Sequence, residues 1–315
     1  MWIAVYFAMA VGVGTLGYLA WAAYMIGKGA AWWPFVVGLP FVYLAFPLFF
    51  TTLWMFFGWR WRTARPRDVE LSFPGRVRVF FHEFISIAQA PKMIVYRALM
   101  PDPAPAPATL PVLLLHGIGC NAAVWTTMRR HLEAQGLGPV YALSYGPPFA
   151  PIETFAVQVA DTIAKIERDT GASQVVIVGH SMGGLVARSY LRAYGPAHVR
   201  RLVTIGTPYA GSRHAWLMSG APLAQMRPGS AYLAALQTRV DAERAVPIVS
   251  IWSWHDSMVT PQISSRLDDH DIVISGVAHN AMLGDPQVLS LVAGEIRKAR
   301  QAMATTPEQA VATAA

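Results

Sequence analysis

Six short apolar runs alternate with longer amphipathic runs between Leu110 and Arg300. The short runs are rich in Val, Ile and Leu, and they read PVLLLHG, PVYALSY, QVVIVGH, RLVTIGT, VPIVSIW and DIVISGV. Because they are apolar almost throughout, they are typical of strands that are buried on both faces of a parallel sheet. The amphipathic runs predict helices at residues 122–135, 152–170, 183–194 and 286–300. This succession predicts an α/β domain with a doubly wound, mostly parallel sheet.

The chain of 315 residues begins with two long runs that carry no charged side chain. The first covers residues 1–27 and the second residues 29–59, with Lys28 between them. Each exceeds the roughly 20 apolar residues that cross a bilayer as a helix. Of the whole chain, 54% is hydrophobic and only 14% is charged, against about 25% charged residues in soluble domains. Residues 1–62 are therefore predicted to form a hairpin of two transmembrane helices.

The second run differs from the first in its prolines and its flanking charges. Three prolines each remove a helical hydrogen bond, so this segment is expected to be kinked or re-entrant: Pro34, Pro40 and Pro47. Four arginines follow the run closely: Arg60, Arg62, Arg65 and Arg67. Only Lys28 lies between the two runs. Since Lys and Arg gather in cytoplasmic loops, both ends of the hairpin are predicted to be cytoplasmic.

The rest of the chain divides into three parts. Residues 63–109 are predicted to be a juxtamembrane segment and a linker, because PDPAPAPATLP alternates Pro and Ala as a stiff spacer does. Within that segment, RVRVFFHEFISI fits either a first strand or an interfacial helix. Residues 110–300 form the α/β domain, and residues 301–315, with few bulky apolar side chains, are predicted to be a disordered tail.

Several classes of protein are excluded by composition. Cys120 is the only cysteine, so no disulfide forms within the chain, and with no basic partner beside it we expect it to be a small packed side chain. The formal net charge of +7 is not accompanied by any nucleic-acid-binding motif, so no nucleic acid partner is predicted. No metal or organic cofactor is predicted either, because the sequence contains no metal-ligand spacing or dinucleotide fingerprint.

The strongest local signal follows the run QVVIV. Here Gly179-His180-Ser181-Met182-Gly183 forms a G-x-S-x-G sequence between a predicted strand and a predicted helix. In that context the pattern predicts a nucleophile elbow, a tight turn that lifts the serine hydroxyl above the sheet. Gly179 and Gly183 are expected where backbone segments pass too close for a Cβ. Ser181 is the candidate nucleophile.

A serine nucleophile requires a base, and the base requires a carboxylate that orients it. Asp256 follows the predicted strand VPIVSIW, and His279 follows the predicted strand DIVISGV. Both are therefore expected at the carboxyl ends of strands, where the sites of open α/β sheets lie. After Ser181 they come in the order acid, then base, which α/β serine hydrolases require.

The first predicted strand ends in LLLHGIGCN. A tetrahedral oxyanion needs two N–H donors, one from the residue after the nucleophile and one from the loop after an earlier strand. Met182 and Ile118 occupy these positions. Two glycines are expected to keep the loop close: Gly117 and Gly119. His116 is expected to orient this loop by hydrogen bonding.

Taken together, LLLHGIGCN, GHSMGG, IGTPYAGS, SWHDSMV and GVAH resemble bacterial α/β-hydrolases of the triacylglycerol lipase and esterase group. The resemblance covers about residues 111–300. It implies an α/β-hydrolase fold, with Ser181 as nucleophile, His279 as base and Asp256 as its orienting acid. Secretion does not carry over to this chain, because secreted lipases lack the paired N-terminal apolar segments.

Hydrolases of this fold insert a cap where residues 212–245 lie in this chain. Trp216, Met218 and Met226 are candidates to line an acyl-chain pocket there, since soft Met side chains adapt to varied shapes. The alternative is that these side chains close the domain core.

The sequence thus predicts a membrane-anchored serine hydrolase that cleaves a lipid or small ester. Its expected location is the inner membrane of a bacterium, as a multi-pass protein with the catalytic domain on the cytoplasmic side. The same residues also fit an acyltransferase, a thioesterase or an amidase, because the triad does not fix the substrate. A non-catalytic membrane adaptor with a hydrolase fold is the alternative from another class.

Overall fold

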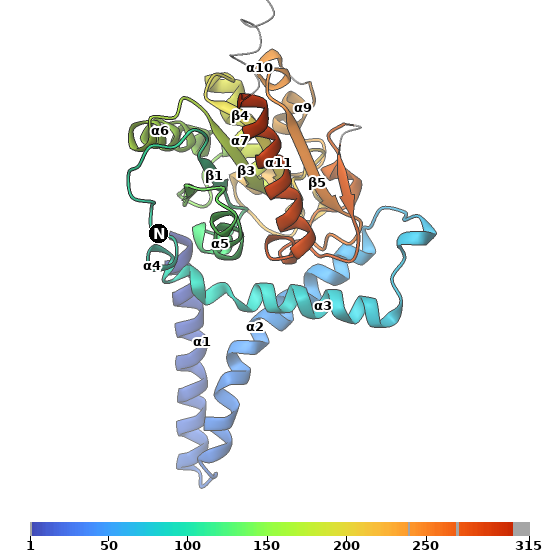
Figure 1. Ribbon diagram of the computed structural model, residues 1–315. Coiled ribbons are helices and arrows are strands. Elements are labelled where there is room, and N and C mark those ends of the chain that lie inside the picture. The colour runs from blue at the N-terminus through green and yellow to red at the C-terminus, as the bar shows by residue number, and fades with distance from the viewer. Residues whose placement is uncertain (1, 239, 269–270, 305–315) are drawn as a thin grey trace, which may run out of the picture.

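The computed structural model describes residues 2–238, 240–268 and 271–304. At its centre is a six-stranded sheet in the order β2-β1-β3-β4-β5-β6, in which all neighbouring strands are parallel (Figure 1). The strands are β1 (Val112–Leu115), β2 (Val140–Leu143), β3 (Val175–His180), β4 (Val199–Ile205), β5 (Ile248–Ser253) and β6 (Ile272–Ile274). Each predicted strand is therefore present, and the parallel sheet is confirmed.

Helices cover both faces of the sheet (Figure 1). The helix predicted at residues 152–170 is α6 (Ile152–Thr170), and the one predicted at residues 183–194 is α7 (Met182–Tyr194). Residues 122–135 instead form a 3-10 turn, η3 (Ala122–Trp125), followed by α5 (Thr126–Ala134). The last helix, α11 (Pro286–Ala304), continues past Arg300, where we expected the tail to begin. The rest of that tail, residues 305–315, lies outside the described residues.

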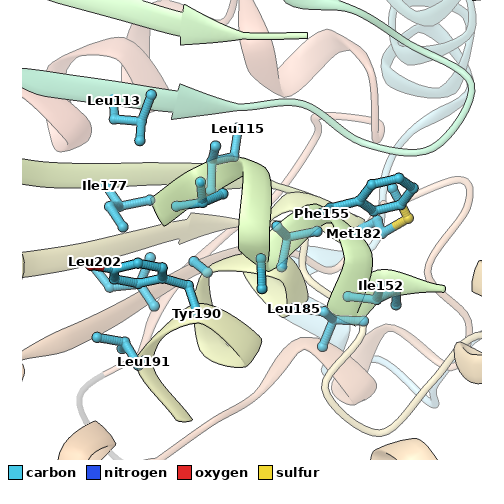
Figure 2. Packing of buried hydrophobic residues seen from close by; sticks show 14 of the residues in the cluster. Leu113, Leu115, Ile152, Phe155, Ile177, Met182, Leu185, Tyr190, Leu191 and Leu202 are labelled. Atoms are coloured by element: carbon cyan, nitrogen blue, oxygen red, sulfur yellow. The ribbon is translucent and has the colours of Figure 1, made fainter. Parts of the chain in front are cut away.

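The strands are buried on both faces, in agreement with their apolar sequences. Leu113, Leu115 and Ile177 pack with Phe155 of α6 and Leu185 of α7 in one cluster (Figure 2). Alternate residues of the same strands belong to a second cluster with α5 and α11 on the other face. The ends of the strands are thus held between two packed layers.

The chain between β4 and β5, where we expected a cap, forms only short helices. They are η4 (Arg213–Trp216), α8 (Ala221–Gln225), α9 (Ala231–Gln237) and α10 (Asp241–Arg244). Arg188 of α7 donates from Nε to Glu243 of α10 at 2.6 Å, and both side chains are buried. Removing one partner of such a pair would leave a buried charge without compensation. This ion pair therefore ties the region to the domain.

Two long apolar helices project from the domain as a hairpin (Figure 1). They are α1 (Trp2–Gly27) and α2 (Trp33–Arg60), and α2 remains a single helix through Pro40 and Pro47. Among the described residues, α2 is the one helix that is both long and apolar enough to cross a membrane. The apolar part of α1 found in the same search, Val11–Gly27, is shorter. Of the two expected spans, one is therefore supported by length and composition.

The segment after the hairpin folds into a helix that lies across the base of the domain (Figure 1). This helix, α3 (Phe73–Ala88), contains RVRVFFHEFISI, so the helical alternative is the correct one. The Ser72 hydroxyl caps it by accepting the Gly75 N–H at 3.4 Å. The remaining short elements are η1 (Arg67–Val69), η2 (Ala90–Met93), α4 (Tyr96–Leu99), η5 (Gln262–Ser265) and η6 (Ala281–Leu283).

The carboxyl-terminal turns of α2 pack directly on the α/β domain. Trp54 is only 7% exposed, and its ring lies 5.5 Å from that of His214, centroid to centroid. A Cβ on Gly58 would lie 2.8 Å from the Ser257 carbonyl oxygen, so only glycine allows this approach. Gln262 accepts the N–H of Thr63 at 2.8 Å, just beyond the helix. The apolar hairpin is therefore joined to the domain by buried contacts.

Candidate active site

Ser181 lies at the sharp turn between β3 and α7. Its φ of 55° is the one positive value among the non-glycine residues of the described ranges, and such a backbone is strained for a residue with a Cβ. Its N–H donates to the Ile205 carbonyl of β4 at 2.8 Å. A Cβ on Gly179 would lie 2.7 Å from the Gly183 carbonyl carbon, and one on Gly183 would overlap the Leu115 carbonyl. Neither glycine position has room for a side chain.

His279 and Asp256 form a buried hydrogen-bonded pair. Nδ1 of His279 lies 2.8 Å from Oδ2 of Asp256, and both residues are 2% exposed. The other oxygen of Asp256 accepts the N–H groups of Met258 at 2.8 Å and of Val259 at 2.7 Å. Because the carboxylate accepts from Nδ1, the Nε2 of a neutral His279 is left with a lone pair. This is the arrangement that a general base needs.

The pair lies beside the Ser181 turn. The ring of His180 lies 4.6 Å from that of His279, centroid to centroid, and its Nε2 donates to the His279 carbonyl at 3.2 Å. A Cβ on Gly206, which follows the acceptor of the Ser181 N–H, would lie 3.0 Å from Oδ2 of Asp256. The fold thus gathers these residues at the carboxyl ends of neighbouring strands.

The pKa of His279 is raised above its ordinary value. Burial lowers this pKa, but the negative charge of Asp256 and the hydrogen bond to it outweigh burial, and the charge of Glu83 adds to their effect. Burial holds the pKa of the adjacent His180 well below its ordinary value, and His279 adds to that effect. At neutral pH His180 is therefore uncharged, whereas the pKa of His279 lies above its ordinary value.

Glu83 of α3 is fully buried, and its carboxylate is bonded to the loop that carries His279. It accepts the N–H of Asn280 at 3.0 Å, the side-chain amide of Asn280 at 2.8 Å and the N–H of Ala281 at 2.9 Å. It also accepts the Ser257 hydroxyl at 2.8 Å. Hydrogen bonds to a charged acceptor are the stronger kind. Four donors from the domain thus converge on one carboxylate of the preceding helix.

The donors to Glu83 lie directly after the two members of the buried pair. Ser257 follows Asp256, and Asn280 follows His279. Sequence reasoning missed Glu83, and its partners lie as far as 198 positions away along the chain. The only local signal is a single acid in the aromatic stretch FFHEF. An acid in so apolar a stretch is exposed, or it is buried with partners.

The loop after β1 passes directly beside Ser181. A Cβ on Gly117 would lie 3.0 Å from that of Ser181, and Gly119 has a left-handed φ of 69°. Ile118 lies between these glycines. Met182 is the first residue of α7, where an N–H has no acceptor within the helix. The two backbone amides expected to hold an oxyanion therefore belong to the segments that border Ser181.

The contacts and pKa values of His116 and Cys120 suit structural roles rather than catalytic ones. Nδ1 of His116 donates to the Gly117 carbonyl at 2.8 Å, and its ring stacks on that of Tyr145 at 4.0 Å. Burial lowers the pKa of His116 to about 4 and raises the pKa of Cys120 to about 12. Neither is charged at neutral pH, so neither acts as a cation or a thiolate. Within the described ranges, no three or more His, Cys, Asp or Glu residues gather in a way that would hold a metal ion.

A cavity of about 460 Å³ joins the loop after β1 to the apolar hairpin. Its walls come from that loop, from α2 and from the region between β4 and β5, and they include Ile118, Phe46, Phe50, Trp54, Met218 and Leu223. We call it the α2 cavity. Its lining is mostly apolar, which suits a ligand with a hydrocarbon portion.

Of the three side chains expected to line an acyl pocket, only Met218 borders the α2 cavity. Trp216 is 61% exposed, and the guanidinium of Arg227 lies 4.5 Å from its ring centroid. Met226 is 5% exposed and belongs to the core cluster on the α7 side of the sheet. The structure therefore places Trp216 on the surface and Met226 in the core, because the chain turns between them.

The chain is similar in sequence to known esterases and lipases. A pimeloyl-acyl-carrier-protein methyl ester esterase of Citrobacter koseri is 34% identical over 106 residues, which are 33% of this chain and 40% of that protein. A triacylglycerol lipase of Pseudarthrobacter phenanthrenivorans is 32% identical over 117 residues, 33% of this chain and 35% of that protein. The chain thus matches less than half the length of either relative.

Solved structures show the same fold. The mature lipase BlEst2 of Bacillus licheniformis superposes with a TM-score of 0.53 over 62% of this chain and 96% of that one, at 16% identity. Lipase B of Aspergillus fumigatus gives a TM-score of 0.52 over 59% of this chain and 52% of that one, at 20% identity. The alpha/beta hydrolase family matches residues 112–310, more than half of the sequence. The chain therefore belongs to the alpha/beta hydrolase family.

Proposed function

We propose that this protein is a membrane-anchored serine hydrolase that cleaves carboxylic esters. The observation that carries the proposal is the buried pair of His279 and Asp256 beside the strained turn of Ser181. The lipases and esterases among its relatives support the same reaction class.

In the proposed reaction, the Ser181 hydroxyl oxygen attacks the ester carbonyl carbon while Nε2 of His279 takes the hydroxyl proton. The carbonyl oxygen becomes an oxyanion, which accepts hydrogen bonds from the Ile118 and Met182 amides. When the carbonyl re-forms, the C–O bond to the alcohol breaks and the alcohol takes the proton from His279. Water then attacks the acyl-enzyme, again with His279 as base, and the carboxylic acid leaves as Ser181 is restored.

Asp256 holds His279 in the required tautomer and stabilises its protonated form. The raised pKa of His279 fits this role, since the ring must accept a proton during attack and return it to the alcohol. The two hydrogen bonds from Met258 and Val259 keep Asp256 itself in place.

The α2 cavity is the proposed site of the acyl chain. Its lining includes both Ile118 of the proposed oxyanion loop and Phe46 of α2. A chain bound there would lie against the apolar hairpin. This position supports a substrate drawn from the membrane, a lipid or an apolar ester.

Membrane anchoring by α1 and α2 together is part of the proposal. Large apolar side chains of α2 are exposed, with Phe41 65% and Phe49 60% accessible, and lipid is the medium in which such exposure costs least. We propose that both helices cross the inner membrane of a bacterium and that the hydrolase domain is cytoplasmic, next to Arg60 and Arg62. A reporter fused after Arg67 should then be active in the cytoplasm. A periplasmic signal would contradict this orientation.

The catalytic proposal is tested by hydrolysis of p-nitrophenyl esters of increasing acyl length with the detergent-solubilised protein. Ser181→Ala should lower kcat by about 10³-fold or more, because the nucleophile is lost while the oxyanion donors remain. A fluorophosphonate should label the parent protein and not the variant. Near-parental turnover by Ser181→Ala would overturn the assignment, and product analysis with an added alcohol would reveal acyl transfer.

A further inference from the structure

A second cavity, of about 390 Å³, lies where α2 ends. It is lined by the last turns of α2, by the segment that leads into α3, by the first turns of α3 and by residues 255–257. It shares no lining residue with the α2 cavity. Its polar lining includes Arg62, Arg65, Arg76 and His255, and we call it the arginine cavity.

His255 lines the arginine cavity and carries a hydrogen-bond donor without a partner. The side chain is 6% exposed, and its Nδ1 accepts the Gly276 N–H at 2.9 Å. A neutral ring must therefore carry its proton on Nε2. Burial, together with the charges of Arg65 and Arg76, lowers the pKa of His255 to about 4, so the ring is neutral at neutral pH. Its buried Nε2 has no hydrogen-bond partner among the described residues.

Arg65 adds a second donor of this kind. Its Nε is buried and has no hydrogen-bond partner in the described part of the chain. Burial lowers its pKa, and of the nearby charges Glu70 opposes this effect while Arg62 and Arg76 add to it. A buried donor without an acceptor is costly, so a ligand that accepts from it would bind favourably.

The charges that face the arginine cavity sum to a positive value. Three guanidinium groups line it, and the carboxylates in the lining are Glu70 and Asp256. Both oxygens of Asp256 accept hydrogen bonds from elsewhere, one of them from His279. Glu70 lies 3.9 Å from Arg76 in an exposed ion pair. The excess of arginine therefore selects an anion, and guanidinium geometry suits phosphate oxygens.

The apolar part of the lining defines the class of anion. Met55, Trp59, Leu71 and Val79 also border the arginine cavity, so a bare ion would leave much apolar surface unfilled. The cavity begins at the end of the helix whose length and composition suit a membrane crossing. Lipid phosphates lie at that depth of a bilayer.

We propose that the arginine cavity binds the phosphate group of a membrane phospholipid, with Arg65 and His255 as donors to its oxygens. The glycerol backbone and the first part of an acyl chain lie against Trp59 and Met55. The proposal rests on the membrane location proposed above, and it is independent of the ester chemistry.

Native mass spectrometry of the full-length protein in detergent tests this site. The probes are dioleoyl phosphatidylglycerol, dioleoylglycerol without a phosphate, and inorganic phosphate. The parent protein should retain phosphatidylglycerol at least tenfold more tightly than either of the others. Equal retention of dioleoylglycerol would overturn a phosphate site. Equally tight binding of inorganic phosphate would assign the cavity to free phosphate and overturn the lipid.

Two variants locate the binding. Arg65→Gln should weaken phosphatidylglycerol binding about tenfold, as the loss of one charge-assisted hydrogen bond does. Arg67→Gln is the matched control, because Arg67 is exposed on the same segment and does not line the cavity. It should change binding less than about twofold. Equal losses in the two variants would overturn the proposal.

Thermal melting of each variant shows whether it is folded. Because lipid retention is read as mass, it also reports on a protein that hydrolyses no ester. Failure of the lipid site is thus distinguishable from failure of the proposed hydrolase activity.

Discussion

Glu83 accepts both the backbone and the side-chain N–H of Asn280, a residue 197 positions later in the chain. The two residues come from the helix that precedes the hydrolase domain and from the loop that carries His279. A helix outside the matched family region therefore holds the loop that carries His279.

Replacing Glu83 with Gln should affect the chemistry as well as the fold. The carboxylate adds to the raised pKa of His279, so its loss should move the acid limb of kcat/KM to lower pH. An amide cannot accept from all four donors, so the His279 loop should loosen, and kcat/KM should fall about tenfold or more. The measurement is a pH profile of ester hydrolysis. His82→Gln, on the exposed neighbour of Glu83, is the control. If Glu83→Gln lowers the stability but leaves the pH profile unchanged, the role of Glu83 is structural only.

Activity should fall as the pH is lowered through the raised pKa of His279. The neutral ring is the base, so protonation abolishes proton transfer from Ser181, and the apparent pKa should lie above the ordinary histidine value of about 6.5. In Asp256→Asn the charge is gone while burial remains, so the apparent pKa should move down. kcat should also fall by about 10⁴-fold, as expected when the orienting acid is lost. Rates measured between about pH 5 and pH 9 test this. If the acid limb of the pH profile does not move in Asp256→Asn, the group that titrates there is not His279.

Gly183→Ala should destabilise the protein markedly. The new methyl group would overlap the Leu115 backbone, which is fixed in the sheet between β2 and β3. The expected loss in the free energy of unfolding is about 3 kcal/mol. Gly294→Ala is the control, since a Cβ there meets nothing within 4 Å and the position is inside α11. It should stabilise by roughly 0.5–1 kcal/mol. Denaturant titrations in mild detergent compare the two, and equal effects would contradict the close packing of the turn.

Phe50→Ala should change the preference for acyl length. Phe50 lines the α2 cavity, whereas Phe49 beside it is 60% exposed and does not. Each methylene that loses its apolar contact costs about 0.8 kcal/mol, or roughly a fourfold change. The ratio of kcat/KM for long esters to that for short esters should therefore fall at least about fourfold in Phe50→Ala. It should stay unchanged in Phe49→Ala. Identical ratios in both variants would place the acyl chain elsewhere.

The sheet and the turn at Ser181 are predictable from the sequence because their signals are local. A strand such as Val175–His180, buried on both faces, must be apolar at every position, and the turn after it requires glycine. Asp256 and His279 are predicted by the same reasoning, since each lies in the loop that follows a strand, β5 or β6.

The contacts of the N-terminal part are not predictable in this way. An acid in FFHEF becomes a buried acceptor only because donors from two distant loops reach it, and no local pattern records them. The places of Trp216 and Met226 also depend on how the chain turns between β4 and β5. Hydropathy identified both side chains as apolar, but it did not indicate that Trp216 would be exposed and Met226 buried in the core.

The close contact between Gly58 of α2 and Ser257 of the domain bears on how this chain can be truncated. A fragment that starts at residue 110 would keep the family motifs and discard one wall of the α2 cavity together with the Glu83 carboxylate. Such a fragment would lack groups that line the cavity and hold the His279 loop. The hairpin and α3 are better regarded as part of the folded body of the protein than as a tether.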